Sequence, residues 1–202
     1  MNWSGRSAVV FYATSWVARL VTLHLAWLGL TLAGGVVLGA FPASYVLLVA
    51  QKRELDGQPL SSGDLWRLFR ANFWRANAFG YATGILIAGG LAEILLLPRG
   101  GVHPLVAMIV PITTLWISYW TINAWVLLAD AEELSLEGTR RTVPLILLHP
   151  LRSISLLLCL GLAILGFALL PALAVAAGSS TVTLILMKVG RGASTSPQPT
   201  GP

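Results

Sequence analysis

The sequence predicts an all-α, polytopic membrane protein folded as a helix bundle. Three observations predict this class: long apolar stretches, few charged residues and an uneven distribution of the basic ones. Hydrophobic residues make up 56% of the 202-residue chain, charged residues only 10%, and the mean hydropathy is +0.78. A soluble domain usually has about 25% charged residues. The net charge of +5 is typical of the basic flanks of membrane spans, and we expect no nucleic-acid partner.

The apolar stretches are long enough for several helices, since about 20 apolar residues cross the hydrocarbon core of a bilayer. These stretches are Leu20–Leu38, Asn77–Leu97, Leu105–Ala129 and Ser153–Met187. Basic segments at 51–76 and 130–152 separate them. We predict two long central helices flanked by two short hairpins, with about four to six crossings or part-crossings of the lipid bilayer.

The basic residues predict the orientation. All of the thirteen Lys and Arg residues except Arg99 fall in segments that a single threading places on one side. Basic residues concentrate on the cytoplasmic side of a membrane, so both termini and both basic segments are predicted to be cytoplasmic. The protein is then predicted to be a multi-pass membrane protein. Residues 1–15 form its N-terminus, 16–189 a single membrane domain, and 190–202 a disordered tail rich in Gly, Ser and Pro.

Each predicted hairpin has a proline near its middle. Trp16–Ala50 has 35 residues, too few for two full spans, and the turn is predicted at Phe41-Pro42-Ala43-Ser44 because proline interrupts helical hydrogen bonding. Ser153–Met187 repeats this geometry with a break at Leu170-Pro171-Ala172. The two hairpins indicate either a loose inverted repeat or the common use of proline turns.

The first basic segment predicts an amphipathic helix. Ser61 or Ser62 can cap it, and Asp64 favours its first turn. Such a helix, rich in aromatic residues and arginine, either lies in the headgroup plane or forms a docking surface for a partner. The candidate interface residues are Leu65, Trp66, Arg67, Phe69, Arg70 and Phe73.

Several polar or aromatic residues fall within the predicted spans. An ionisable group there is a functional hypothesis by default. His24 is expected near the cytoplasmic end of its span and Glu93 near the outer interface, where each can snorkel or bond a neighbour. Trp116, Trp120 and Asn123 recur at i, i+4 and i+7, which indicates either a sugar-sized cavity or ordinary helix packing.

Two G-x-x-x-G patterns predict close helix contacts. They occupy Gly35–Gly39 and Gly80–Gly84. Small residues at this spacing let two backbones approach closely. The contact can form within the chain or between copies in a homo-oligomer.

Enzyme chemistry has no motif in the sequence. The histidines His24, His103 and His149 lack partners at metal-ligand spacing, and neither a nucleophile elbow nor a phosphate-binding loop is present. We therefore expect no enzymatic activity, no catalytic or metal site and no cofactor. Glu137 and Arg141 stand at i, i+4, which predicts an ion pair on a helix surface.

Several segments together resemble the YesL-like family of bacterial membrane proteins over roughly Trp16–Lys188. The segments are Thr22–Trp27, Phe41–Tyr45, Lys52–Gly57, Leu65–Phe73 and Leu148-His149-Pro150. The chain departs from the family at the proline turn, where a Thr-Gly-Pro-like stretch is absent. The family is a domain of unknown function whose genes often neighbour carbohydrate ABC importers.

The resemblance implies an accessory or regulatory component that works with importer permease subunits. Two other classes stay open: an autonomous small-solute transporter or channel, and a structural membrane-assembly protein. A transporter needs a polar central pathway, and the sequence offers few residues to build one.

Overall fold

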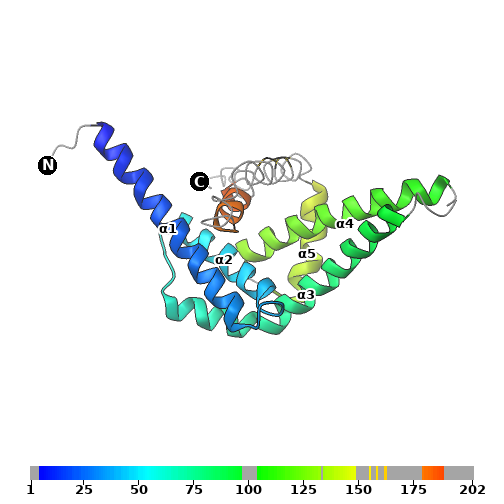
Figure 1. The fold of residues 1–202 in the computed structure, drawn as a ribbon, viewed down its shortest axis with the longest axis horizontal. Coiled ribbons are helices and arrows are strands. Elements are labelled where there is room, and N and C mark those ends of the chain that lie inside the picture. Colours follow the sequence, from blue (N-terminus) through cyan, green and yellow to red (C-terminus); the bar gives the residue numbers. More distant parts are fainter. Residues whose placement is uncertain are drawn as a thin grey trace, which may run out of the picture.

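The computed structural model describes residues 5–96, 104–132, 134–148 and 179–188, with the single positions 155, 158 and 162. Over these residues the secondary structure is helical and contains no strand, which confirms the predicted all-α class (Figure 1). Three stretches are long and apolar enough to cross a membrane: Thr14–Ala33, Ser62–Leu95 and Met108–Asp130.

The first helix is α1 (Gly5–Ala33), followed by α2 (Ala40–Leu55), α3 (Ser62–Leu96), α4 (Pro104–Asp130) and α5 (Leu136–Leu148). Residues 179–188 are also helical. The short helix α2 packs against α1, α3 and α4. The second half of α3 and the first half of α4 run side by side away from α1, to the right-hand end of Figure 1.

The turn between α1 and α2 lies at residues 34–39, so the predicted turn at Phe41-Pro42-Ala43-Ser44 is wrong. α1 ends in a Schellman motif: the Val36 amide donates to the Thr31 carbonyl, and the Gly35 amide donates to the Leu32 carbonyl. Gly35 has a φ of 79°, a left-handed conformation that suits glycine. The helix therefore stops at glycine, and α1 is longer than the short arm that the sequence predicted.

Pro42 is compatible with a helix at its position. It is the third residue of α2, where the backbone amide has no partner within the helix and a proline removes no hydrogen bond. The turn itself is tight, because a Cβ added at Gly34 would overlap the backbone of Gly39. Gly35 and Gly39, expected to form a helix contact, thus belong to the turn.

α2 ends and α3 begins with recognisable capping motifs. Gly57, at φ 72°, closes a second Schellman motif in which its amide donates to the Glu54 carbonyl. The Asp64 amide then donates to Ser61 Oγ at 3.2 Å, and the Ser61 amide donates to the Asp64 carboxylate at 3.2 Å. This reciprocal pair confirms the predicted serine cap and the predicted place of Asp64.

α3 is one continuous helix of 35 residues that bends along its length (Figure 1). The sequence predicted a cytoplasmic helix and a separate span starting at Asn77. The two join because no proline or glycine interrupts the stretch between Asp64 and Phe79, so helical hydrogen bonding continues. The predicted span Asn77–Leu97 is the later part of α3.

α3 and α4 form a close hairpin. A Cβ added at Gly90 would overlap the Thr114 side chain, so the space between the two helices there is too small for a methyl group. α4 begins at Pro104, where the fixed φ of proline suits a first helical position. Its bounds confirm the span predicted at Leu105–Ala129.

α5 lies in the second basic segment and packs against α4. Ser135 caps it, since its Oγ accepts the Gly138 amide at 2.9 Å. The break predicted at Leu170-Pro171-Ala172 and the tail at 190–202 lie outside the described residues, so the second hairpin and its likeness to the first stay predictions.

The core forms where α2, α3 and α4 meet. Its buried residues include Tyr45, Leu48, Ala76, Ala124 and Met187, the last from the helix at 179–188. Phe79, Trp120 and Trp125 pack around them. The helix at 179–188 is therefore part of the same bundle.

Candidate functional site

A network of ion pairs joins the ends of α2 and α4. The Glu132 carboxylate accepts hydrogen bonds from Lys52 Nζ at 2.7 Å and from Arg53 Nη2 at 2.6 Å. Arg53 also donates to Gln58 Oε1 at 3.0 Å. Lys52 and Arg53, at the end of α2, are thereby held against Glu132, which lies two residues after the end of α4.

Both the charge and the backbone of Glu132 are perturbed. Partial burial acts to raise its pKa, but the hydrogen bonds and charges of Arg53 and Lys52 outweigh this and hold the pKa below its ordinary value. Its φ of 53° is left-handed, a conformation that costs a residue with a Cβ about 1–2 kcal/mol. The ion pairs compensate for this cost. Sequence reasoning missed the contact because about 80 residues separate the partners.

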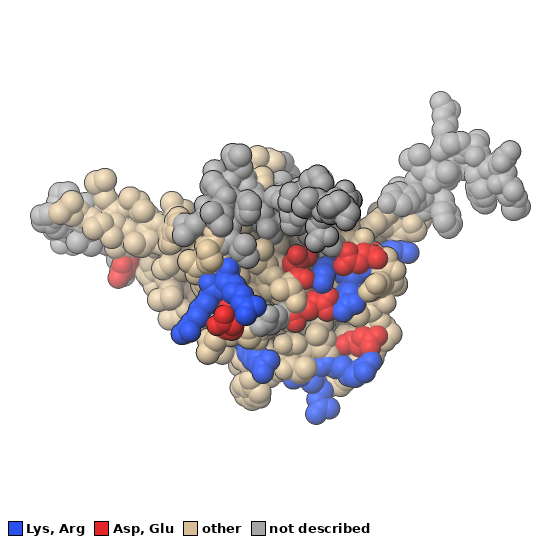
Figure 2. All heavy atoms as spheres, turned by 180° about the vertical axis from the view of Figure 1, so that it is seen from behind, with Lys and Arg blue, Asp and Glu red and all other residues tan. Residues whose placement is uncertain are grey.

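Two further ion pairs lie on the surface of α1, α2 and α5. Arg19 Nη1 of α1 lies 2.8 Å from Glu54 Oε2 of α2. Arg141 Nε and Glu137 Oε1 are 3.3 Å apart, which confirms the predicted i, i+4 pair on α5. Figure 2 shows charged residues of both signs gathered over the middle and lower part of one face of the molecule.

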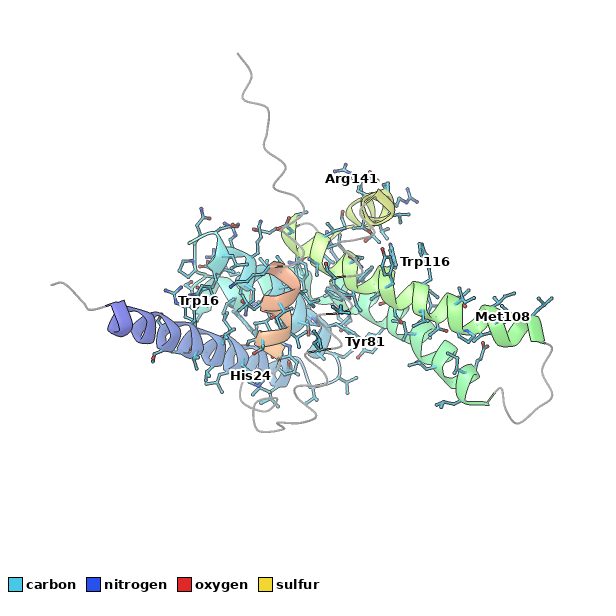
Figure 3. All side chains as sticks on the ribbon, turned by 90° about the horizontal axis from the view of Figure 1, so that it is seen from above. Trp16, His24, Tyr81, Met108, Trp116 and Arg141 are labelled. Carbon is cyan, nitrogen blue, oxygen red and sulfur yellow. The ribbon has the colours of Figure 1, made fainter. Side chains whose placement is uncertain are left out.

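His24 is buried in the bundle. Its side chain is only 5% exposed, its Nδ1 lies 2.7 Å from Ser179 Oγ, and its ring stacks on Trp27. Figure 3 shows it where α1 passes the helix at 179–188. It lies midway along the apolar stretch Thr14–Ala33, and its place relative to a membrane stays a prediction. A bond to a neighbour was one of the alternatives that the sequence left open, and Ser179 is that neighbour in the structure.

Three more polar groups are buried near the centre of the bundle. Gln51 Nε2 donates to the Ser180 carbonyl at 3.1 Å. Within the described part of the chain, the side-chain amide nitrogen and oxygen of Asn77 have no hydrogen-bond partner, and neither has the Ser180 hydroxyl. None of these three was a predicted site residue, although Gln51 and Asn77 border apolar runs.

The predicted stripe on α4 divides into an exposed and a buried part. Trp116 is exposed and stacks on Tyr119, and it lies with Met108 on the outer half of α4 (Figure 3). Trp120 packs against Phe79, and Asn123 is buried and donates to the Tyr119 carbonyl at 2.8 Å. The three residues thus face different surroundings.

Glu93 lies on the exposed surface near the end of α3. Its expected place close to the outer membrane interface stays a prediction. Among the described residues, no group of three His, Cys, Asp or Glu side chains is arranged as metal ligands would be.

The predicted interface helix forms the first part of α3, and the structure divides its residues. Phe69 is buried against Ala43 and Val46 of α2, with Leu65 and Phe73 partly buried beside it. Arg67 pairs with Asp64, and Arg70 is exposed. Trp66 and Trp74 are exposed by 44% and 74%. The apolar face of this helix is therefore buried against α2. The edge that carries Trp66 and Trp74 is exposed, together with the arginines.

The second G-x-x-x-G pattern forms a contact within the chain. A Cβ added at Gly80 would overlap the Phe41 ring, and one at Gly84 would lie 3.7 Å from it. Tyr81 packs edge-on against the same ring and donates its hydroxyl to the Val37 carbonyl at 2.8 Å. These glycines let α3 approach the first turn of α2.

A groove of about 580 Å³ opens between α3 and the segment leading into α5. Its lining residues are Arg75, Ala78, Phe79, Ala82, Leu134, Ser135, Leu136 and Thr139. This volume is within the range of ligand pockets. Sequence reasoning did not predict the groove, because its two sides come from segments about 50 residues apart.

Comparison with known proteins gives one finding of similarity. A family model described as "Protein of unknown function, DUF624" matches residues 20–92, which cover about the second half of α1, all of α2 and most of α3. No curated protein and no solved structure matches the chain. The match and the apolar helices together fit an integral membrane protein of unknown activity.

Proposed function

We propose that the protein is a non-enzymatic accessory component of a carbohydrate ABC importer in the bacterial inner membrane. The main support is that buried polar side chains form hydrogen bonds between helices. His24 and Gln51 bond to Ser179 and Ser180 of another helix, so they hold the bundle together instead of presenting reactive groups. The resemblance to the YesL-like family supports the importer as the partner.

The exposed edge of the first part of α3 is the proposed permease contact. Trp66 and Trp74 are exposed there, and Arg70 lies between them in sequence. Tryptophan and arginine are enriched at protein interfaces. Since the opposite face of this helix packs on α2, a partner would bind a surface that is already rigid.

A mild-detergent affinity pull-down from native membranes, read by mass spectrometry, tests this proposal. The test variant is Trp66→Ala with Trp74→Ala, and the matched control is Trp116→Ala, an exposed tryptophan on α4. Permease subunits should be recovered with the wild type and the control and lost with the double variant. Recovery of the chain alone from wild-type membranes would contradict the accessory role.

One observation favours an autonomous transporter instead. The buried amide of Asn77 has no hydrogen-bond partner in the described structure, and an unsatisfied polar group of this kind can mark a water or solute path. Liposome flux assays of the purified protein would test this function. Solute uptake that falls in Asn77→Leu would support it, and absence of uptake would contradict it.

A further inference from the structure

The groove between α3 and α5 has one charged group available to a ligand. Ser135 Oγ already accepts the Gly138 amide, and Thr139 Oγ1 donates to the Ser135 carbonyl. Arg75 is exposed, and no acidic side chain among the described residues pairs with it. A guanidinium group at the edge of a groove binds phosphate or carboxylate well.

Arg75 marks the boundary between polar and apolar parts of α3. It follows Asp64, Arg67 and Arg70, and the seventeen residues of Ala76–Ala92 that come after it are all uncharged. Trp74, beside it, is largely exposed. Arginine and tryptophan at the end of an apolar span lie at the level of the lipid headgroups.

Apart from Ser135 and Thr139, the rest of the groove lining is apolar, and it follows α3 away from that boundary. Ala78 and Ala82 stand three and seven residues after Arg75, on the same face of α3, and their small side chains leave space. Leu136 lines the groove and is 85% exposed. An apolar chain in the groove would cover these three side chains.

We propose that this groove binds one anionic phospholipid. Its phosphate pairs with Arg75, and an acyl chain lies along Ala78 and Ala82 beneath Leu136. A lipid fits better than a soluble anion, because Arg75 is the one charged residue of the lining and five of the other seven lining residues are apolar. It also fits better than a peptide, because Leu86, farther along α3, is exposed and extends the apolar surface towards the bilayer.

Native mass spectrometry of the full chain in mild detergent tests the headgroup contact. Dioleoyl phosphatidylglycerol, which is anionic, and dioleoyl phosphatidylcholine, which is zwitterionic, are titrated separately, so that the acyl chains are the same and only the headgroup differs. The wild type should bind the anionic lipid about fivefold more tightly, the effect of one basic group near an anionic headgroup. Arg75→Gln should abolish this preference, Arg75→Lys should keep most of it, and the control Arg19→Gln, at an exposed arginine of α1 outside the groove, should leave it unchanged.

A second variant tests the acyl-chain contact. Ala82→Trp fills the groove and should lower binding of both lipids, whereas Ala88→Trp, at an exposed position on α3 outside the groove, should not. The proposal would be overturned by equal binding of the two lipids to the wild type, by an unchanged preference in Arg75→Gln, or by equal lipid binding in the two tryptophan variants.

Discussion

α2 and the outer halves of α3 and α4 are both apolar, but they have opposite surroundings. α2 has nine buried residues among its sixteen, and three helices surround it. The outer halves of α3 and α4 expose large apolar side chains such as Ile85, Leu95, Met108 and Leu115. In the bundle, therefore, one helix is buried by protein, while the other two helices expose their apolar surface.

The difference shows that hydrophobicity alone does not decide where a membrane helix lies. In lipid, an apolar side chain gains little by leaving the bilayer, so helix association depends on close packing and polar contacts. α2 has both: Phe41 packs into the space above Gly80, and Gln51 bonds to Ser180. At about 24 Å, its sixteen residues are also shorter than the hydrocarbon core, which is about 30 Å thick.

Of the changes that test the packing of α2, filling the space at Gly80 should lower the free energy of unfolding most. Gly80→Leu forces a side chain into the Phe41 ring, so we expect a loss of about 3 kcal/mol in unfolding free energy. Gly89→Leu is the matched control, because nothing lies within 4 Å of a Cβ added there. Thermal and denaturant unfolding in detergent measures both. Equal stability of the two variants would show that α2 is not packed on α3.

Removing the carboxylate of Glu132 should have the next largest effect. Glu132→Gln weakens two ion pairs that hold the end of α2 to α4, and we expect a loss of about 2 kcal/mol. Glu137→Gln, which breaks the exposed pair with Arg141, should cost less than about 0.5 kcal/mol. The same unfolding measurement compares them, and equal losses would mean that the Glu132 network adds nothing to the burial of α2.

The Glu132 network should also make stability depend on pH. Because the pKa of this carboxyl is lower in the folded protein than its ordinary value, its contribution is fully present above the ordinary pKa. It is lost as the pH falls through the lowered folded value. Unfolding curves between pH 7 and pH 3 should therefore show a smaller acid loss in Glu132→Gln than in the wild type. Identical pH profiles would contradict this assignment.

Removing the hydrogen bond between α1 and the helix at 179–188 should have the smallest effect on the free energy of unfolding. Ser179→Ala removes the partner of His24, and buried hydrogen bonds between membrane helices contribute about 0.6 kcal/mol on average. The control is Ser118→Ala, because the Ser118 hydroxyl donates to the Thr114 carbonyl of its own helix. A loss no larger than that of the control would show that this contact does not hold the helix in the bundle.

Local signals predicted local structure well. The cap at Ser61, the span in α4 and the Glu137–Arg141 pair all depend on residues a few positions apart. The turn before α2 was misplaced because Pro42 is more visible in a sequence than Gly35, although proline is tolerated in a first helical turn and the left-handed glycine ends the helix.

The candidate sites depended on contacts that periodicity does not reveal. The amphipathic pattern of Leu65, Phe69 and Phe73 correctly predicted a helix with one apolar face, but it could not show that α2 would cover that face. Glu132 and the groove beside Arg75 each combine residues from distant segments. Neither helical nor strand spacing relates such residues, so only the folded chain brings them together.

Labelling with a lipid-soluble diazirine in liposomes, mapped by peptide mass spectrometry, tests the contrast between buried and lipid-facing helices most directly. The structure predicts strong labelling of residues 85–95 and 108–116 and protection of residues 42–51. Labelling of residues 42–51 as strong as that of the α3–α4 hairpin would place α2 in contact with lipid and contradict its burial in the bundle.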